Sequence, residues 1–228
     1  MVEIILSVKN LNVELDNEDI IDNLSFNLNR GEVLTILGPN GAGKTVLLKS
    51  LLGALPYKGE IKWKEGIKIG YVPQRLPFIK DIPLNVLEFF KLKNATDKEI
   101  EEMLKLFKFN ESFLNKKIGE LSSGQFQRVL IAWSLAKHPD VLLFDEPTTG
   151  VDVGGEETIY SLLSELKKKR KLTIILVTHD LSVVHSFSDY VICLNKTPLC
   201  QGTPKKILTS ANLQKLYKEE VKFYQHIH

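Results

Sequence analysis

The chain has 228 residues, of which 43% are hydrophobic and 25% charged, a composition typical of a folded soluble protein and not of a disordered one. This length accommodates one large domain or a domain with an inserted lobe. The net charge of +2 is too small to indicate nucleic acid as a partner, and we expect none.

The first part of the chain carries strand patterns on both sides of one helix pattern. Alternating apolar and polar residues, or short apolar runs, predict strands at 4–9, 20–28, 33–37, 60–63 and 68–72, with a turn at 16–19. The run Val46–Leu52 predicts a helix after the third strand. Two prolines, Pro73 and Pro77, make the following segment irregular.

Residues 83–137 change to helical patterns. A short helix is expected from Pro83. A second helix is expected around residues 100–107, where apolar residues recur at helical spacing. Thr96, followed three residues later by Glu99, predicts a capping box at its start. A third is expected over Gly124–Lys137. This section predicts an all-helical lobe inserted into an α/β core.

The α/β pattern then resumes. The continuous apolar run Val141–Phe144 predicts a strand buried on both faces of a parallel sheet. A helix at 155–169, a strand at 173–177, a helix at 181–187 and a final strand at 190–194 follow. One or two short helices are expected after Pro204.

Cysteine count and hydropathy set two further limits. Two cysteines, Cys193 and Cys200, give no disulfide framework, so a reducing compartment is the default expectation. The N-terminus lacks the features of a signal peptide. No apolar run approaches the ~20 residues that span a bilayer, so we expect any membrane role to depend on another polypeptide.

A glycine-rich loop between a strand and a helix indicates a phosphate-binding P-loop. Its glycines and the helix N-terminus direct backbone N–H groups toward an anion. Lys44 is expected to reach the β- and γ-phosphates and the Thr45 hydroxyl to bind Mg²⁺. An ordinary glycine-rich turn would not need the lysine and the hydroxyl. The residues concerned are Gly38, Pro39, Asn40, Gly41, Ala42, Gly43, Lys44 and Thr45, followed by Val46.

Two carboxylates, Asp145 and Glu146, end the apolar strand at 141–144. In a protein with a P-loop, an aspartate at this place can hold Mg²⁺ through water. The adjacent glutamate is placed to act as general base on the water that attacks the γ-phosphate. The alternative is a solvated acidic pair at a strand end.

A third motif, Leu121-Ser122-Ser123-Gly124-Gln125, precedes the helix at 124–137. Serine and glycine at a helix start can form an anion-binding nest. The alternative is a simple N-cap in which Ser122 or Ser123 caps the helix.

With these motifs in this order, the sequence resembles the ATP-binding cassette (ABC) ATPase family over almost its whole length. The resemblance implies a P-loop NTPase fold, with a RecA-like core, an N-terminal antiparallel β subdomain and an inserted helical subdomain. It implies one ABC ATPase domain over 1–228, with the core at 1–75 and 138–228 and the helical subdomain at 76–137.

The resemblance also implies roles for single residues. Glu146 would be the catalytic base, with His179 contacting the γ-phosphate and Gln74 sensing Mg²⁺ and water. Thr45, Gln74 and Asp145 would hold Mg²⁺. Two chains would pair head to tail with two ATP molecules between them. The signature residues Ser122, Gly124 and Gln125 would then reach the partner's ATP, and Asp152 would support the contact.

Three positions depart from the family pattern. Leu15 stands where an aromatic residue usually stacks on adenine, a contact worth ~1–3 kcal/mol in comparable base contacts. Val46 replaces a hydroxyl residue that usually meets the α-phosphate. Ser123 replaces a more frequent glycine, which we expect to be tolerated.

Local sequence within the family is most similar to the ATPases of zinc and manganese importers, with zinc favoured. The resemblance implies a peripheral location on the cytoplasmic face of the membrane, bound to a permease through residues around 74–86, including Leu76, Phe78 and Ile79. An extracytoplasmic substrate-binding protein would be an indirect partner. His226 and His228 end the chain, and a frayed terminus without metal explains them at least as well as a zinc site.

The sequence leaves four alternatives to the ATPase of a zinc importer. An importer of manganese or iron, or another ABC transporter, would share all the motifs. A non-transport ABC ATPase usually has two cassettes or long coiled-coil insertions. A P-loop kinase or GTPase would lack the signature motif, and the guanine-reading N-K-x-D is missing. A purely structural nucleotide-binding module would not need Glu146 and His179.

Overall fold

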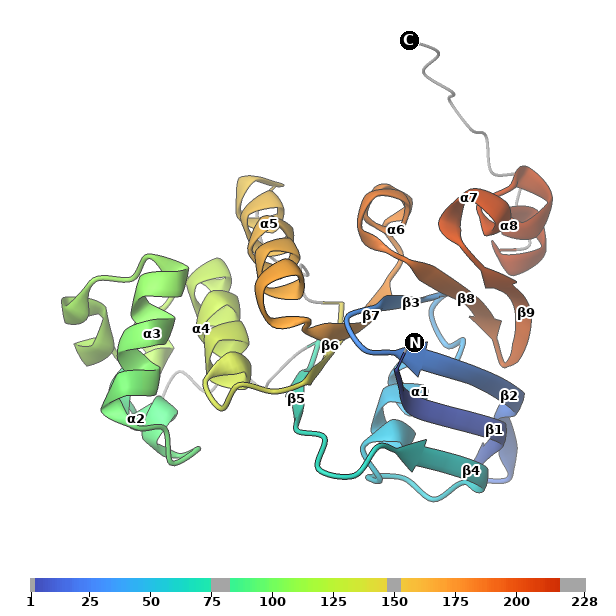
Figure 1. The fold of residues 1–228 in the computed structure, drawn as a ribbon, viewed down its shortest axis with the longest axis horizontal. Coiled ribbons are helices and arrows are strands. Elements are labelled where there is room, and N and C mark those ends of the chain that lie inside the picture. Colours follow the sequence, from blue (N-terminus) through green and yellow to red (C-terminus); the bar gives the residue numbers. More distant parts are fainter. Residues whose placement is uncertain (1–2, 75–82, 147–152, 218–228) are drawn as a thin grey trace, which may run out of the picture. The chain divides into compact units, whose positions relative to one another are not determined.

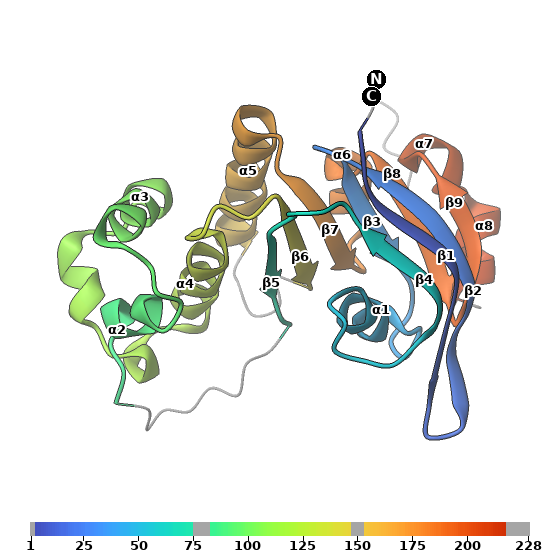
Figure 2. The same cartoon turned by 60° about the horizontal axis from the view of Figure 1, so that its bottom comes forward.

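The computed structural model describes residues 3–74, 83–146 and 153–217, with the backbone alone at 153–158. It consists of two compact units. Unit 1 contains residues 1–66 and 173–228, and unit 2 contains residues 67–172. Figures 1 and 2 show the elements of each unit.

Unit 1 contains two β-sheets (Figure 1). Antiparallel strands form the first in the order β2-β1-β4, and the second has the order β7-β3-β8-β9. In the second sheet β3 runs parallel to β7 and β8, whereas β9 is antiparallel to β8. The strands are β1 (Ile4–Leu15), β2 (Glu18–Asn29), β3 (Val33–Leu37), β4 (Lys58–Trp63), β7 (Thr173–Thr178), β8 (Tyr190–Asn195) and β9 (Thr197–Gly202).

Buried strands and one helix build the frame of unit 1. Every residue of β3 and β7 is buried, as expected for parallel strands covered on both faces. Trp63 ends β4 and donates its Nε1–H to the Leu51 carbonyl at the far end of α1, 2.9 Å away. The helices of the unit are α1 (Lys44–Leu51), α6 (Leu181–Phe187), α7 (Pro204–Ile207) and α8 (Ser210–Tyr217).

Unit 2 pairs β5 (Ile69–Val72) with β6 (Val141–Asp145) in parallel, and inserts helices between them (Figure 1). The inserted helices are α2 (Val86–Lys91), α3 (Asp97–Phe107), two 3₁₀ turns (Glu111–Asn115 and Ile118–Glu120) and α4 (Ser123–Leu135), and α5 (Val153–Arg170) follows β6. The predicted α/β fold with an N-terminal antiparallel sheet and an inserted helical lobe is confirmed.

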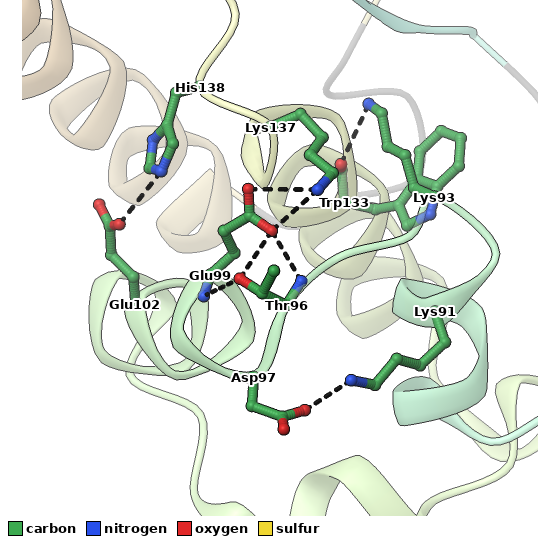
Figure 3. A network of polar contacts seen from close by, with 9 residues as sticks. All are labelled: Lys91, Lys93, Thr96, Asp97, Glu99, Glu102, Trp133, Lys137 and His138. Atoms are coloured by element: carbon green, nitrogen blue, oxygen red, sulfur yellow. Dashed lines mark hydrogen bonds and ion pairs between the residues drawn. The ribbon is translucent and has the colours of Figure 1, made fainter.

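Polar contacts organise the start of α3 (Figure 3). The Glu99 carboxylate accepts hydrogen bonds from the Thr96 N–H, 2.7 Å away, and from the Lys137 ammonium, 3.0 Å away. The predicted capping box is therefore confirmed.

Trp133 of α4 donates its indole N–H to the Phe89 carbonyl, and the Lys93 ammonium lies 4.4 Å from the centre of the Trp133 ring.

Four predictions about local structure were wrong. The first turn occupies only residues 16–17, because residues 18 and 19 already pair with β1. The helix expected from Pro83 begins at Val86, because Asn85 caps it. β8 is not the last strand, since β9 follows it. The two cysteines were expected to form no disulfide, but a disulfide joins Cys193 of β8 to Cys200 of β9.

Candidate active site

The P-loop of unit 1 connects β3 to α1. Gly41 and Gly43 have φ angles of +79° and +92°, in the left-handed region that favours glycine. Gly43 is also the N-cap of α1, so the amides of Thr45 and Val46 lie in the first turn of the helix. This is the local geometry that an anion-binding helix N-terminus requires. Asn40 and Gly41 are exposed, whereas Thr45 and Val46 are half-buried.

The Lys44 ammonium folds back onto the loop. It donates to the carbonyl oxygens of Gly38 and Pro39 at 2.8 and 2.9 Å, and the residue is only 6% exposed. A phosphate oxygen is a stronger acceptor than a carbonyl because the hydrogen bond is charge-assisted. The lysine is thus held at the loop and can exchange a carbonyl partner for a phosphate.

Two close approaches give a second reason for glycine at Gly38 and Gly43 of this loop. A Cβ at Gly43 would lie 2.8 Å from the Ile20 carbonyl oxygen, and a Cβ at Gly38 would lie 2.1 Å from that of Leu194. Strand β2 and the end of β8 therefore touch the loop directly. The sequence carries no local signal for either contact, because both arise from pairing between distant strands.

The predicted His179 lies directly after β7. Leu37 and Thr178 are register partners at the ends of the parallel strands β3 and β7. Gly38 and His179, the residues that follow them, therefore lie at the same edge of the sheet. His179 is exposed. The next residue, Asp180, caps α6 by accepting hydrogen bonds from the Ser182 and Val183 N–H groups. Burial raises the pKa of Asp180, but these bonds and the nearby histidine outweigh it and lower the pKa overall.

Unit 2 brings Gln74 and Glu146 together. Val72 and Phe144 are register partners, so both side chains follow the carboxyl ends of adjacent parallel strands. The Gln74 Nε2–H donates to Glu146 Oε2 at 2.7 Å. Glu146 is half-buried and has a φ of +48°, an uncommon backbone conformation for a residue other than glycine. The structure thus holds the expected base by a hydrogen bond that the sequence did not predict.

Asp145 is the last residue of β6 and only 2% exposed. Burial, followed by the charge of Asp145, raises the pKa of Tyr71 to about 12. The Gln74 amide nitrogen donates to Glu146, so the amide oxygen is the atom of this side chain that can act as a metal ligand. A carboxylate, an amide oxygen and a hydroxyl are hard oxygen donors, so the side chains of Asp145, Gln74 and Thr45 are each of a chemical type that binds Mg²⁺.

The signature motif lies at the N-terminus of α4. The Ser122 hydroxyl accepts from the Gln125 N–H, and the Gln125 side chain accepts from the Ser122 N–H, both at 3.2 Å. The N-cap expected at Ser122 or Ser123 is therefore Ser122. Both serines are exposed, and a Cβ at Gly124 would meet nothing within 4 Å. Among the described residues, packing does not require glycine there.

Some of the expected site residues are placed only in part. Leu15 is half-buried and ends β1 opposite Glu18, and Ile20 rather than Leu15 is the hairpin residue found against the P-loop. Several expected residues lie outside the described residues: Asp152, the terminal histidines, and Leu76, Phe78 and Ile79, which were expected to face a permease. In the part of the chain that the structure describes, no helix is long and apolar enough to cross a membrane. The same described residues contain no group of three or more His, Cys, Asp or Glu side chains that could bind a metal ion.

Comparison with known proteins gives consistent relatives. The family model described as ABC transporter matches residues 21–149, more than half of the chain. A zinc import ATP-binding protein ZnuC from Buchnera aphidicola subsp. Schizaphis graminum is 37% identical over 230 residues, covering 98% of this chain and 96% of the relative. The protein of that name from Hydrogenovibrio crunogenus is 35% identical over 240 residues, covering 98% and 93%.

Solved structures agree with this assignment. A putative metal-chelate type ABC transporter in an inward-facing conformation has a TM-score of 0.84 at 29% identity, covering 94% of this chain and 89% of that one. A bacterial ABC transporter cassette in a dimeric structure has a TM-score of 0.75 at 29% identity, covering 87% and 98%. The predicted P-loop NTPase fold is confirmed, and this chain belongs to the ABC transporter family, among its ATP-binding and ATP-hydrolysing subunits.

Proposed function

We propose that this chain is the ATPase subunit of a zinc importer and acts on a separate membrane permease from the cytoplasmic face. The observation that carries the cargo assignment is the match to relatives named as zinc import proteins over 98% of the chain. An extracytoplasmic substrate-binding protein would deliver the metal to the permease. In this proposal zinc is the transported cargo and not a cofactor of the ATPase.

The working unit is a head-to-tail homodimer that holds two ATP molecules. Support comes from the exposed serines of the signature motif and from the open space at Gly124, because an exposed helix start suits a ligand held by a second copy. Asp152 would strengthen the same dimer contact. ATP binding closes the dimer and hydrolysis releases it, which makes ATP the ligand of a two-state cycle.

Each side chain of the site has a role in hydrolysis. Lys44 and the loop amides bind the phosphates, and Glu146 accepts a proton from the attacking water. Gln74, bonded to Glu146, orients that carboxylate and the water. His179 contacts the γ-phosphate. Thr45, Asp145 and Gln74 would hold Mg²⁺, which when bound neutralises phosphate charge.

Metal uptake tests the cargo. A strain that lacks this chain should lose zinc accumulation at low external zinc and regain it with the wild-type chain but not with Glu146→Gln. Ser161→Ala, a change on the exposed surface of α5, is the matched control and should restore uptake. Restoration of manganese accumulation without zinc accumulation would overturn the zinc assignment.

The dimer has its own test. Ser122→Arg places a bulky cation at the signature motif and should abolish ATPase activity, while Ser112→Arg makes the same change at an exposed serine elsewhere in unit 2. Equal activity of the two variants would refute the trans site.

A further inference from the structure

The hairpin formed by β8 and β9 reaches the P-loop at its turn. Asn195 and Thr197 are partners across the turn, and Lys196 between them has a φ of +61°. The Lys196 N–H donates to the Ala42 carbonyl of the P-loop at 3.2 Å, and the Lys196 carbonyl accepts from the Asp22 N–H of β2 at 2.9 Å. The turn is therefore bonded to both the loop and the neighbouring sheet.

The hairpin also touches the other end of the P-loop. The Leu194 carbonyl lies so near Gly38 that a Cβ there would be 2.1 Å from the oxygen. Residues 194–196 thus contact the P-loop at Gly38 and at Ala42. A shift of this turn would move the backbone that must enclose the phosphates.

The hydrogen-bond ladder of the hairpin is irregular just before the turn. Cys193 pairs with Cys200, but the next pair is Leu194 with Pro198, so Leu199 is an extra residue in β9. Such a bulge interrupts the ladder, and Pro198 has no N–H to donate. The noncovalent ladder is therefore interrupted beside the segment that carries the P-loop contacts.

The disulfide lies at this irregularity. Cys193 and Cys200 are directly opposite each other, with Cα atoms 5.0 Å apart, and a bond joins their sulfurs. Cys193 is fully buried in an apolar cluster with Leu37, the last residue before the P-loop, and with Leu213 and Leu216 of α8. The bond thus closes the hairpin at the last regular pair before the turn.

We propose that the Cys193–Cys200 disulfide positions the P-loop through the β8–β9 turn, so that breaking the bond weakens ATP binding. The two cysteines are positioning residues, because they act on the nucleotide through residues 194–196. This inference rests on ATP binding at the P-loop and does not depend on the transported cargo.

Reduction by a small dithiol proceeds by two thiol–disulfide exchanges. A reagent thiolate attacks the sulfur of half-buried Cys200, the S–S bond breaks, and the buried Cys193 sulfur leaves with the electron pair and takes a proton. The second reagent sulfur then displaces Cys200. The reagent becomes a cyclic disulfide, and the protein gains the two hydrogens as two thiols.

The experiment compares ATP affinity of the full chain in the two thiol states, which mass spectrometry distinguishes by two hydrogen atoms. Reduction of the wild-type protein with dithiothreitol should raise the Kd for ATP about fivefold, equivalent to about 1 kcal/mol, the size of one backbone hydrogen bond. The KM for ATP should rise with it, while kcat at saturating ATP stays within about twofold.

Cys200→Ser is the matched variant. It should bind ATP like the reduced wild type and show no response to the reagent. An equal Kd in both thiol states, even with a lowered melting temperature, would overturn the proposal and leave the proposed ATPase function intact. Failure of oxidised glutathione to form the bond would also overturn it. Absence of ATP binding in both states would instead contradict the ATPase function.

Discussion

Replacement of Gly124 by alanine separates a structural role of the signature glycine from a role in binding the partner's ATP. Gly124 is the second residue of α4, and a Cβ built there meets nothing within 4 Å. Alanine is favoured over glycine within a helix by up to about 1 kcal/mol. Gly124→Ala should therefore stabilise the isolated chain and raise its melting temperature by roughly 2–4 °C.

The same methyl group should impair the enzyme. If a second copy brings its ATP against Gly124, an added methyl group overpacks that contact at a cost of about 1–3 kcal/mol. At about 1.4 kcal/mol per factor of ten, ATPase activity should fall roughly 5- to 150-fold. A more stable but less active variant is the signature of a glycine kept for a partner.

Two measurements check this reasoning: thermal unfolding of the chain without nucleotide, and steady-state ATPase activity. Ser161→Ala on the exposed surface of α5 is the control, since it also favours the helix but lies away from the signature motif. Wild-type ATPase activity in Gly124→Ala would refute the trans contact. A lowered melting temperature would instead show that alanine does not fit the chain.

Three further changes have definite expected outcomes. Glu146→Gln should lower ATPase activity by about 10²-fold or more and accumulate an ATP-bound dimer in size-exclusion chromatography; turnover at the wild-type rate would remove Glu146 as the base. Leu15→Tyr should tighten ATP binding by at least about fivefold through stacking but leave inorganic triphosphate binding unchanged, so equal tightening of both ligands would contradict stacking. Hydrogen bonds from the Thr96 N–H, then Lys137, lower the pKa of Glu99 to about 2, so its contribution to stability is present above its ordinary value of 4.5 and lost as pH falls toward 2. Glu99→Gln should flatten the acid-unfolding curve in that window when followed by circular dichroism, and an unchanged curve would show that Glu99 is not coupled to folding.

Local signals predicted the parts of the fold that depend on short stretches of chain. The strand before the P-loop, the caps at Thr96 and Ser122 and the helix over 181–187 are each determined by a few neighbouring residues. Strand β9 escaped prediction because Thr197–Gly202 has no apolar alternation and contains Pro198. Such a strand is fixed by pairing with β8 at the sheet edge and not by its own composition.

The candidate site divides in the same way. The sequence identifies the P-loop, the Asp145–Glu146 pair and the signature motif because each is a run of consecutive residues. The bond between Gln74 and Glu146 joins residues 72 positions apart, and no local pattern encodes it. The contact of Leu194 with Gly38 is of the same kind. The disulfide had a local signal in the seven-residue separation of Cys193 and Cys200, which a hairpin turn brings opposite each other. The number of cysteines alone does not contain this signal.

The two tryptophans of the chain provide one built-in optical reporter for each unit. Trp63 is bonded to the last turn of the helix that begins at the P-loop, and Trp133 lies in the helix that begins at the signature motif. A Trp63→Phe protein would emit only from the helical lobe, and a Trp133→Phe protein only from the nucleotide-binding sheets. Fluorescence after rapid mixing with ATP could therefore time the response of each half separately, without any attached dye.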